Sequence, residues 1–291
     1  MKPASFEYHR PASIGEALKL LAEHRAEAKL ISGGQSLVPM MNMRLASPAH
    51  LIDINDLSEL AGVKKRGDLI EIGTLTRHHE VASSSLAAAH CPLVSQAAST
   101  IGHYAIRQRG TLGGSLAHAD PAAQMSLVAR TLDARITLAS HAGERELASV
   151  EFFEGAMTTA IRPDEMIVRV GFPIQQPGER SAFKLFSRRH GDYAIVSVAL
   201  VVGMQEGRVA RLQLGVGGAS PVPIRLDRAL DDFLGKVPDA GWVESMALAS
   251  YHAITPEEST RIPAIYRKEL TQTLVSQALN ELLAEQEMEP A

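Results

Sequence analysis

The sequence predicts an α+β protein made of two successive units, and three observations support this. Its 291 residues exceed the length of one typical domain, about 100 to 200 residues. Short apolar runs typical of strands alternate along the chain with amphipathic runs typical of helices. The stretch "PIQQPGERS" at 173–181 has two prolines, a glycine and no apolar periodicity, which predicts a linker at about 175–180. We therefore expect one unit at 1–174 and a second at 181–291.

Within the first unit, residues 1–55 predict a compact subdomain of alternating helices and strands. A helix is expected directly after Ser13, whose hydroxyl is a typical N-cap, with Glu16 as its capping-box partner. The segments "AKLIS" and "HLIDI" predict two buried strands of one small sheet. Between them, "SLVPMMNMRLA" predicts a helix whose first turn tolerates proline, and "SGGQS" joins the first strand to that helix.

Residues 56–174 predict a second subdomain, built on an antiparallel sheet. The segment "GVKKRGDLIEIGTLT" predicts a hairpin with the basic residues 64–66 at a solvated turn. Helical spacing is found in "SLAAAHCPLVSQAASTIGH", and Asp120 followed by Pro121 predicts the start of the helix "PAAQMSLVARTL". The segments "ARITLAS" and "ERELASVEFF" predict further strands.

The second unit predicts a small antiparallel sheet with helices. The run "AIVSVALVVGMQEGRVARLQLGVGG" begins with a segment that fits a helix or a strand, followed by two strands around a turn at 205–207. The segments "ESMALASYHA" and "YRKELTQTLVSQALNELLAEQ" have helical spacing.

The composition argues against several classes of protein. The formal net charge is −4 and no long basic run is present, so a nucleic acid is not expected as partner. The single cysteine, Cys91, allows neither an internal disulfide nor an iron–sulfur cluster held by this chain. No window approaches the roughly 18 consecutive apolar residues of a membrane span, and the first residues have no apolar leader region. We expect no membrane span and a cytoplasmic location.

Two segments with glycine pairs, "ISGGQSL" and "TLGGSL", are the candidate site. Their first paired glycines, Gly33 and Gly113, are 80 positions apart. Glycine pairs let the backbone bend and let a ligand approach the amides, and a following helix start favours an anion. Flanking hydroxyl groups add donors for phosphate oxygens. Together the two loops are expected to clasp a diphosphate, although either loop alone is also typical of a purely structural turn.

These two loops, within "SGGQSLVPMMNMRLASPAHLIDI" and "IRQRGTLGGSLAHADPAA", resemble the FAD-binding medium subunit of the molybdenum hydroxylases. This family includes carbon monoxide dehydrogenase, quinoline oxidoreductase and the flavin domain of xanthine dehydrogenase. The resemblance continues through "FKLFSRRHGDYAIVSVAL" and "YRKELTQTLVSQAL", so it covers nearly the whole chain. It implies a vanillyl-alcohol-oxidase (PCMH)-type FAD-binding domain of two subdomains, about 1–55 and 56–174, followed by a C-terminal domain at 181–291.

The resemblance also implies a set of cofactor-binding residues, with both loops wrapped around the FAD diphosphate. The set consists of Lys29, Ser32, Gly33, Gly34, Gln35, Ser36, Leu37, Thr111, Leu112, Gly113, Gly114, Ser115, Gln124 and Tyr193. Two positions depart from the family pattern, because Gln124 stands where an aspartate is common and Ser115 where an asparagine is frequent. Tyr193 is expected either to shield the flavin ring from solvent and oxygen or to pack at a domain junction.

The function that the resemblance implies is electron transfer by an FAD subunit. A large partner would carry molybdopterin and oxidise the substrate, a small partner would carry two [2Fe-2S] clusters, and this chain would pass electrons to an external acceptor. The expected assembly is a dimer of such heterotrimers, a heterohexamer. No side chain of this chain is expected to be catalytic, and no metal is expected in it. The alternatives are a self-sufficient FAD-dependent oxidase or reductase of the same fold, and a non-redox nucleotide-binding or assembly subunit.

Other chemically suggestive residues are expected to be structural. His103, His118 and Asp120 lie on one segment without a convergent partner, and His78 and His79 are expected on the surface. Asp53 is expected to cap the turn that follows it. Arg107 and Arg109 fit either phosphate binding or the holding of a loop through carbonyl groups. Trp242 and the methionines of "PMMNM" are expected to pack in the core or at an interface.

Overall fold

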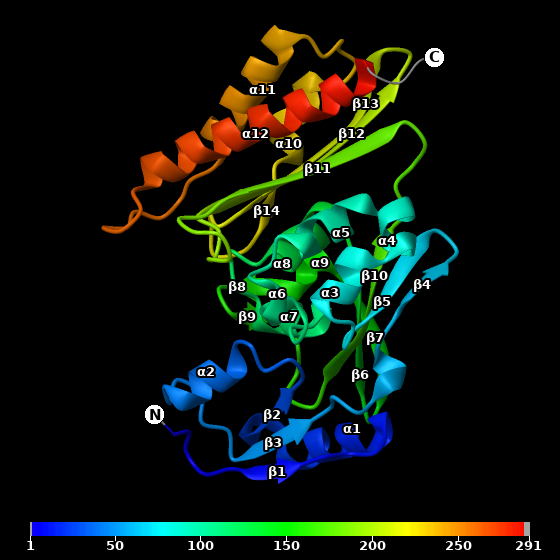
Figure 1. The fold of residues 1–291 in the computed structure, drawn as a ribbon, viewed down its shortest axis with the longest axis vertical. Helices are drawn as coiled ribbons and strands as arrows, with labels where there is room; N and C mark the ends of the chain where they lie inside the picture. Colours follow the sequence, from blue (N-terminus) through cyan, green and yellow to red (C-terminus); the bar gives the residue numbers. More distant parts are fainter. Residues whose placement is uncertain (1, 288–291) are drawn as a thin grey trace.

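The computed structural model describes residues 2–287 and forms an elongated molecule of three stacked parts. Figure 1 shows the N-terminal part at the bottom, a middle part with most of the short helices, and the C-terminal part at the top. Buried apolar residues of the described chain form three clusters that correspond to these parts.

The N-terminal part is a three-stranded parallel sheet in the order β1-β3-β2. Its strands are β1 (Glu7–His9), β2 (Ala28–Ile31) and β3 (His50–Asp53), and its helices are α1 (Ile14–His24), η1 (Arg25–Glu27), α2 (Leu37–Asn42) and η2 (Ser58–Leu60). The N-cap prediction is confirmed, since the Ser13 hydroxyl accepts from the Glu16 amide at 3.2 Å. The capping-box prediction needs correction, because the Glu16 carboxylate reaches past Ser13 and accepts from the Ala12 amide at 2.7 Å. The edge strand β1 is short and mostly exposed, so it has no apolar pattern in the sequence.

The middle part is built on an antiparallel sheet, as predicted, and the sheet has five strands in the order β4-β5-β10-β6-β7. Its strands are β4 (Val63–Arg66), β5 (Leu69–Gly73), β6 (Arg135–Ser140), β7 (Gly143–Ala148) and β10 (Met166–Pro173), with the small pair β8 (Phe153–Gly155) and β9 (Thr158–Thr159). Its helices are α3 (His78–Ser83), α4 (Ser85–His90), α5 (Pro92–Ser99), α6 (Tyr104–Arg107), α7 (Leu112–His118), α8 (Gln124–Thr131) and α9 (Ser149–Phe152).

Two local predictions in this part need correction. The helix expected from Pro121 begins at Gln124, because residues 120–123 form a turn in which the Asp120 carboxylate accepts from the Ala122 amide at 2.8 Å. Asp120 is therefore not an N-cap. The strand expected over "SVEFF" is mostly the short helix α9, which is followed by β8.

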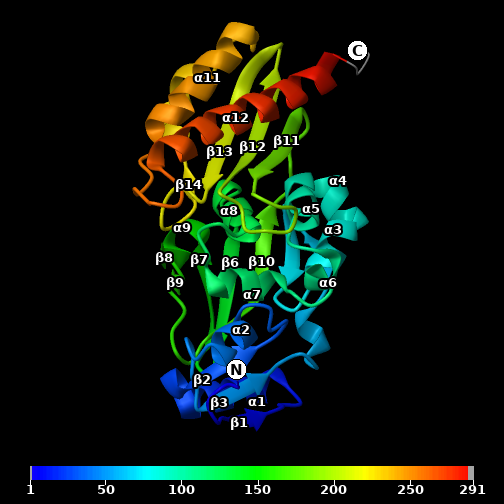
Figure 2. The same ribbon diagram turned by 60° about the vertical axis from the view of Figure 1, so that its left-hand side comes forward.

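The C-terminal part is the antiparallel sheet β11-β12-β13-β14, covered on one face by two helices (Figure 2). Its elements are β11 (Glu179–Phe186), β12 (Val196–Gln205), β13 (Arg208–Gly217), β14 (Ile224–Arg225), α10 (Asp227–Leu230), η3 (Asp231–Phe233), α11 (Ala240–Ala253) and α12 (Ala264–Glu287). The helices α5 and α8 of the middle part contact the other face. The sheet is thus buried on both sides.

This double burial explains why "AIVSVALVVG" fitted a helix or a strand equally well. Val198, Leu200 and Val202 belong to the C-terminal cluster, whereas Ala199 and Val201 belong to the cluster of the middle part. A strand with two buried faces has no alternation of apolar and polar residues, so its sequence reads as one apolar run.

The connection between the second and third parts is held in place by hydrogen bonds. The Gln175 amide donates to the His90 carbonyl at 2.8 Å, and the Met204 amide donates to the Gly178 carbonyl at 3.1 Å. Strand β11 begins at Glu179, inside the stretch predicted as linker. Among residues 2–287, no helix has the length and apolar character needed to cross a bilayer.

Candidate functional site

A cavity of about 830 Å³ lies where the N-terminal part meets the middle part, and the connection between β11 and β12 borders it. Its volume is in the upper part of the range of pockets that hold small molecules and cofactors, about 300 to 1,000 Å³. All of the predicted site residues line this cavity except Leu112. The Leu112 side chain is fully buried in the core of the middle part, and its amide donates to the Thr76 carbonyl at 3.0 Å.

The first glycine segment supplies unpaired backbone donors to the cavity. It connects β2 to α2, and within the described chain the backbone N–H groups from Gly33 to Ser36 donate no hydrogen bond. The segment is held from behind, because the Asn55 side-chain amide donates to the Ser32 carbonyl at 2.9 Å. Consecutive free amides at the start of a helix form an electropositive concavity that suits phosphate oxygens.

The second glycine segment has a different role, because it is the first turn of α7 rather than a loop. Thr111 is the N-cap and accepts from the Gly114 amide at 3.1 Å. The Gly113 amide donates to the Thr74 carbonyl at 2.9 Å, and the Ser115 amide donates to the Thr111 carbonyl. These amides are therefore already paired. This segment lines the cavity with closely packed backbone and with the Ser115 hydroxyl.

Close packing explains most of the paired glycines. A Cβ atom on Gly33 would overlap the Arg109 carbonyl, and one on Gly113 would overlap the Thr74 hydroxyl. Of the four paired glycines, only Gly34 has a positive φ, +70°. The expected freedom to bend therefore applies to one position, while Gly33 and Gly113 allow segments of the protein itself to approach each other.

Arg77 links the two glycine segments and was not identified from the sequence. It lies between β5 and α3, and its guanidinium donates to the Asn55 side-chain oxygen at 2.8 Å and to the Arg109 carbonyl. Since Asn55 in turn holds Ser32, one side chain connects both walls of the cavity. Burial lowers the pKa of Arg77 from its ordinary value. A lone arginine after a strand carries no sequence signal for such a role.

The prediction for Asp53 is confirmed. One carboxylate oxygen of Asp53 accepts from the Asn55 amide at 2.9 Å and from the Asn55 side chain at 2.6 Å, and the other accepts from the Tyr8 hydroxyl at 2.6 Å. Burial raises the pKa of Asp53, but these hydrogen bonds outweigh it, so the pKa lies below its ordinary value. Asp53 thus orients Asn55, which holds the first glycine segment.

The expectation that His78 lies on the surface is wrong. His78 is the first residue of α3, is 5% exposed and lines the cavity. Its amide donates to the Gly110 carbonyl at 3.0 Å, and its ring lies so close to Gly110 that a Cβ there would be 2.9 Å from ring carbon Cδ2. Burial, with the charges of Arg107 and Arg77, lowers the pKa of His78 to about 4, so the imidazole is neutral at pH 7. The ring nitrogen Nδ1 has no hydrogen-bond partner.

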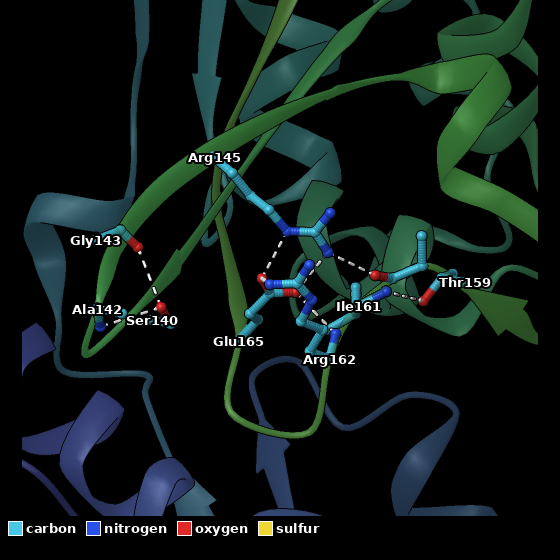
Figure 3. A network of polar contacts seen from close by, with 9 residues as sticks. Ser140, Ala142, Gly143, Arg145, Thr159, Ile161, Arg162 and Glu165 are labelled. Carbon is cyan, nitrogen blue, oxygen red and sulfur yellow. Dashed lines mark hydrogen bonds and ion pairs between the residues drawn. The ribbon is translucent and has the colours of Figure 1, made fainter.

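Another wall of the cavity is fixed by a buried ion pair, drawn in Figure 3. The Arg145 guanidinium donates to both carboxylate oxygens of Glu165, at 2.6 and 2.8 Å, and to the Ala160 carbonyl at 2.8 Å. The Arg162 amide donates to the same carboxylate at 2.8 Å. Burial raises the pKa of Glu165, but these hydrogen bonds and the nearby guanidinium groups hold it below its ordinary value. The exposed Arg162 guanidinium also lies at the cavity wall, 3.9 Å from the same carboxylate.

The remaining predicted residues lie around the cavity. Tyr193 lies in the connection between β11 and β12, is 62% exposed and lines the cavity. His103 lies against this connection, with its ring centroid 5.3 Å from that of His190. His118 and Asp120 line the cavity, and among the described residues neither belongs to a group of three or more potential metal ligands. Gln124, the first residue of α8, is buried at its wall.

The structure supports one of the two roles considered for Arg107, and it confirms the expected packing of Trp242. The Arg107 guanidinium donates to the Ile101 and Gly102 carbonyls, both at 2.9 Å, so it holds a loop. Trp242 is buried in the C-terminal cluster, and its ring N–H donates to the Phe233 carbonyl at 3.1 Å.

The sequence matches two known families over most of its length. Residues 4–175 match the family described as FAD binding domain in molybdopterin dehydrogenase. Residues 181–282 match the family described as CO dehydrogenase flavoprotein C-terminal domain.

Individual known proteins are similar over nearly their whole length. The chain is 39% identical over 284 residues to the 6-hydroxypseudooxynicotine dehydrogenase complex subunit alpha of Paenarthrobacter nicotinovorans, covering 97% of this chain and 96% of that protein. It is 33% identical over 280 residues to the carbon monoxide dehydrogenase medium chain of Hydrogenophaga pseudoflava, covering 96% and 98%.

Solved structures are similar over the same extent. A carbon monoxide dehydrogenase from Hydrogenophaga pseudoflava that lacks the Mo-pyranopterin moiety of its cofactor has a chain with a TM-score of 0.93 and 34% identity, covering 98% of this chain and 99% of that one. Quinoline 2-oxidoreductase from Pseudomonas putida 86 has a chain with a TM-score of 0.93 and 32% identity, with the same coverage.

Proposed function

The chain belongs to the family of FAD-binding medium subunits of molybdenum hydroxylases, and from this membership we propose that it binds one FAD in the cavity and serves as an electron-transfer subunit. The observation that carries the proposal is the row of unpaired amides from Gly33 to Ser36 at the wall of a cavity of about 830 Å³. An FAD diphosphate has the negative charge and the acceptor oxygens that this row can satisfy.

The residues of this chain would bind and orient the cofactor rather than act as acids or bases. The first glycine segment would hold the diphosphate, with the Ser115 hydroxyl as a further donor and with Lys29 and Arg162 as cations at the cavity wall. The exposed ring of Tyr193 would lie over the flavin end of the site and limit its access to solvent and oxygen. Bound FAD would supply the redox chemistry, accepting electrons from a partner subunit and passing them to an external acceptor.

We also propose the assembly in which this subunit works. A large subunit would carry molybdopterin, a small subunit would carry two [2Fe-2S] clusters, and two such heterotrimers would form a heterohexamer. Similar proteins are described as complex subunits or medium chains, which supports a multi-subunit arrangement. Cys91, the single thiol, is buried, and burial raises its pKa to about 12, so it is unsuited to hold a cluster.

The division of the chain at about residues 175–180 is likewise a proposal. It is supported by the two family matches, which end at 175 and begin at 181. The FAD-binding domain would then be residues 1–174, and the C-terminal domain, residues 181–291, would contribute Tyr193 to the site.

The proposal is tested by placing a negative charge where the diphosphate is expected. Ser36 precedes α2 and its side chain makes no capping hydrogen bond, so neither replacement removes a contact that holds the helix. We expect Ser36→Asp to weaken FAD binding at least about tenfold through charge repulsion, and Ser36→Asn to weaken it only a few-fold. FAD stoichiometry and Kd are measured by absorbance and flavin fluorescence on the purified full chain. Absence of FAD binding by the unmodified chain would refute the proposal, and equal binding by the two variants would refute the placement of the diphosphate.

A further inference from the structure

A cluster of three histidines lies in the N-terminal part, apart from the residues that line the cavity. His9 is the last residue of β1, His24 the last residue of α1 and His50 the first residue of β3. The ring centroids of His24 and His50 are 3.6 Å apart, and that of His9 lies 5.3 and 5.2 Å from them. None of the three lines the cavity described above.

The fold brings these side chains together from three elements. Strands β1 and β3 are parallel neighbours, with Glu7 paired to His50, and His9 lies two residues after Glu7 on the same face of β1. Helix α1 ends over this face, because the His24 ring contacts both other rings. All three histidines therefore belong to regular secondary structure rather than to a loop.

The distances between the potential ligand atoms suit a small cation. One nitrogen of each ring lies within 4.8 Å of one nitrogen of each other ring. His9 Nε2 and His50 Nδ1 are 3.0 Å apart, and the Glu7 carboxylate oxygens lie 3.9 Å from His9 Nε2 and 3.6 Å from His50 Nδ1. Tetrahedral zinc with bonds of about 2.0 to 2.2 Å keeps its ligand atoms roughly 3.4 Å apart. The three imidazole rings are therefore close enough to bind one zinc ion after small side-chain movements, and Glu7 has to move inward to join them.

The chemistry of the donors also indicates the metal. Imidazole nitrogen suits Zn²⁺ and the neighbouring transition metals, and one carboxylate completes a four-ligand set. The histidine side chains on the two strands are 16% and 17% exposed, so protein shields the site, whereas Glu7 is 68% exposed and can move to close it. The hydrogen bond between His9 and His50 would be replaced by the metal, and the stacked His24 ring would turn about its side-chain torsions.

We propose that His9, His24 and His50, with Glu7 as fourth ligand, form a structural Zn²⁺ site. Bound zinc ties the edge strand β1 and the end of α1 to the central strand β3. Without it, β1 is a three-residue edge strand with mostly exposed side chains. The end of α1 continues directly into Arg25, Ala26 and Ala28, which line the cavity. Zinc therefore stabilises the subdomain that carries the first glycine segment.

The test uses the purified full chain, stripped of metal with a chelator. Titration with ZnCl₂ by calorimetry is expected to show one saturable site, and Co²⁺ is expected to give the visible absorption of a tetrahedral complex. His9→Gln and His50→Gln are expected to weaken Zn²⁺ binding at least tenfold. His141→Gln is the matched control, because His141 lies in the exposed turn between β6 and β7, and it should bind Zn²⁺ like the unmodified chain.

A further variant tests the site at a position where the replacement is not expected to disturb folding. Glu7→Gln changes an exposed side chain on the edge strand and is expected to fold normally while weakening Zn²⁺ binding several-fold. Zinc should also raise the Tm of the unmodified chain but not that of His50→Gln. Absence of saturable binding, or equal binding by the unmodified chain and both histidine variants, would overturn the proposal. The FAD content of each sample is recorded separately, so loss of the zinc site is distinguished from failure of the proposed flavin function.

Discussion

The hydroxyl oxygen of Ser32 lies 3.1 Å from the hydroxyl oxygen of Thr111, although 79 positions separate the two residues. This hydrogen bond joins the segment that follows β2 to the N-cap of α7. The two cavity walls are therefore connected directly as well as through Arg77. The relative position of the two glycine segments is therefore set by contacts within the protein itself.

The first prediction concerns this hydrogen bond. We expect Ser32→Ala to lower the free energy of unfolding by about 1 kcal/mol, and Thr111→Val by about 2 kcal/mol, because the latter also removes the N-cap of α7. In the double variant the two effects should be less than additive by about 1 kcal/mol. Urea unfolding of the flavin-free chain measures all four proteins. Strict additivity would show that the two hydroxyls do not interact.

The second prediction concerns Arg77 as a positioning residue. Arg77→Met removes the donors to Asn55 and to the Arg109 carbonyl, so the two walls should separate. We expect FAD affinity to fall at least about tenfold and stability to fall by about 2 kcal/mol. Arg66→Met is the control, since Arg66 lies on the exposed hairpin and should change stability by less than about 1 kcal/mol. An unchanged Kd for FAD in Arg77→Met would contradict this role.

The third prediction concerns the buried neutral His78. Its folded-state pKa of about 4 is below the ordinary value of 6.5, so the unfolded chain binds more protons between these values. As pH falls from 6.5 towards 4, this residue should therefore cost up to about 3 kcal/mol of stability. In His78→Gln this loss should be absent. Unfolding is measured from pH 7 to pH 4, and parallel curves for the two proteins would mean that His78 titrates normally.

The fourth prediction concerns the ion pair between Arg145 and Glu165. Glu165→Gln leaves the Arg145 charge without its partner, and we expect a loss of about 2 kcal/mol at pH 7. Because the folded-state pKa of Glu165 is lowered, its contribution is complete above the unfolded carboxylate pKa of about 4.3 and is lost as pH falls through the folded value. The difference in free energy of unfolding between Glu165→Gln and the unmodified chain should therefore shrink as pH falls. Glu146→Gln, in an exposed pair with Arg135, should cost less than about 1 kcal/mol.

The fifth prediction concerns the glycine pairs. Gly33→Ala should destabilise the protein by more than about 2 kcal/mol even without FAD, because the added Cβ overlaps the Arg109 carbonyl. Gly15→Ala is the control, since Gly15 lies in α1 and its added Cβ would meet only the Ser13 hydroxyl at an ordinary contact distance of 3.9 Å, so the change should be neutral or stabilising. Thermal unfolding of the flavin-free chains provides the comparison. Normal stability of Gly33→Ala would mean that this glycine is kept for ligand access alone.

The sequence by itself determined the elements that local physics controls. The start of α1 follows from Ser13 and Glu16, the hairpin of β4 and β5 follows from two short strand-like segments around the turn at Gly67, and the glycine pairs identified both cavity walls. These signals could be found because capping, alternation and turn chemistry act between residues that are close in the chain.

Only the tertiary structure decided what depends on partners distant in sequence. It showed that β12 is a strand buried on both faces, that His78 is buried against Gly110, and that Arg77 joins Asn55 to Arg109. It also places His9, His24 and His50 next to one another, although their spacing in the sequence gives no sign of this. The physical reason is that burial, pKa and ligand geometry are properties of the packed surroundings, and those surroundings are set by which strands and helices pack together.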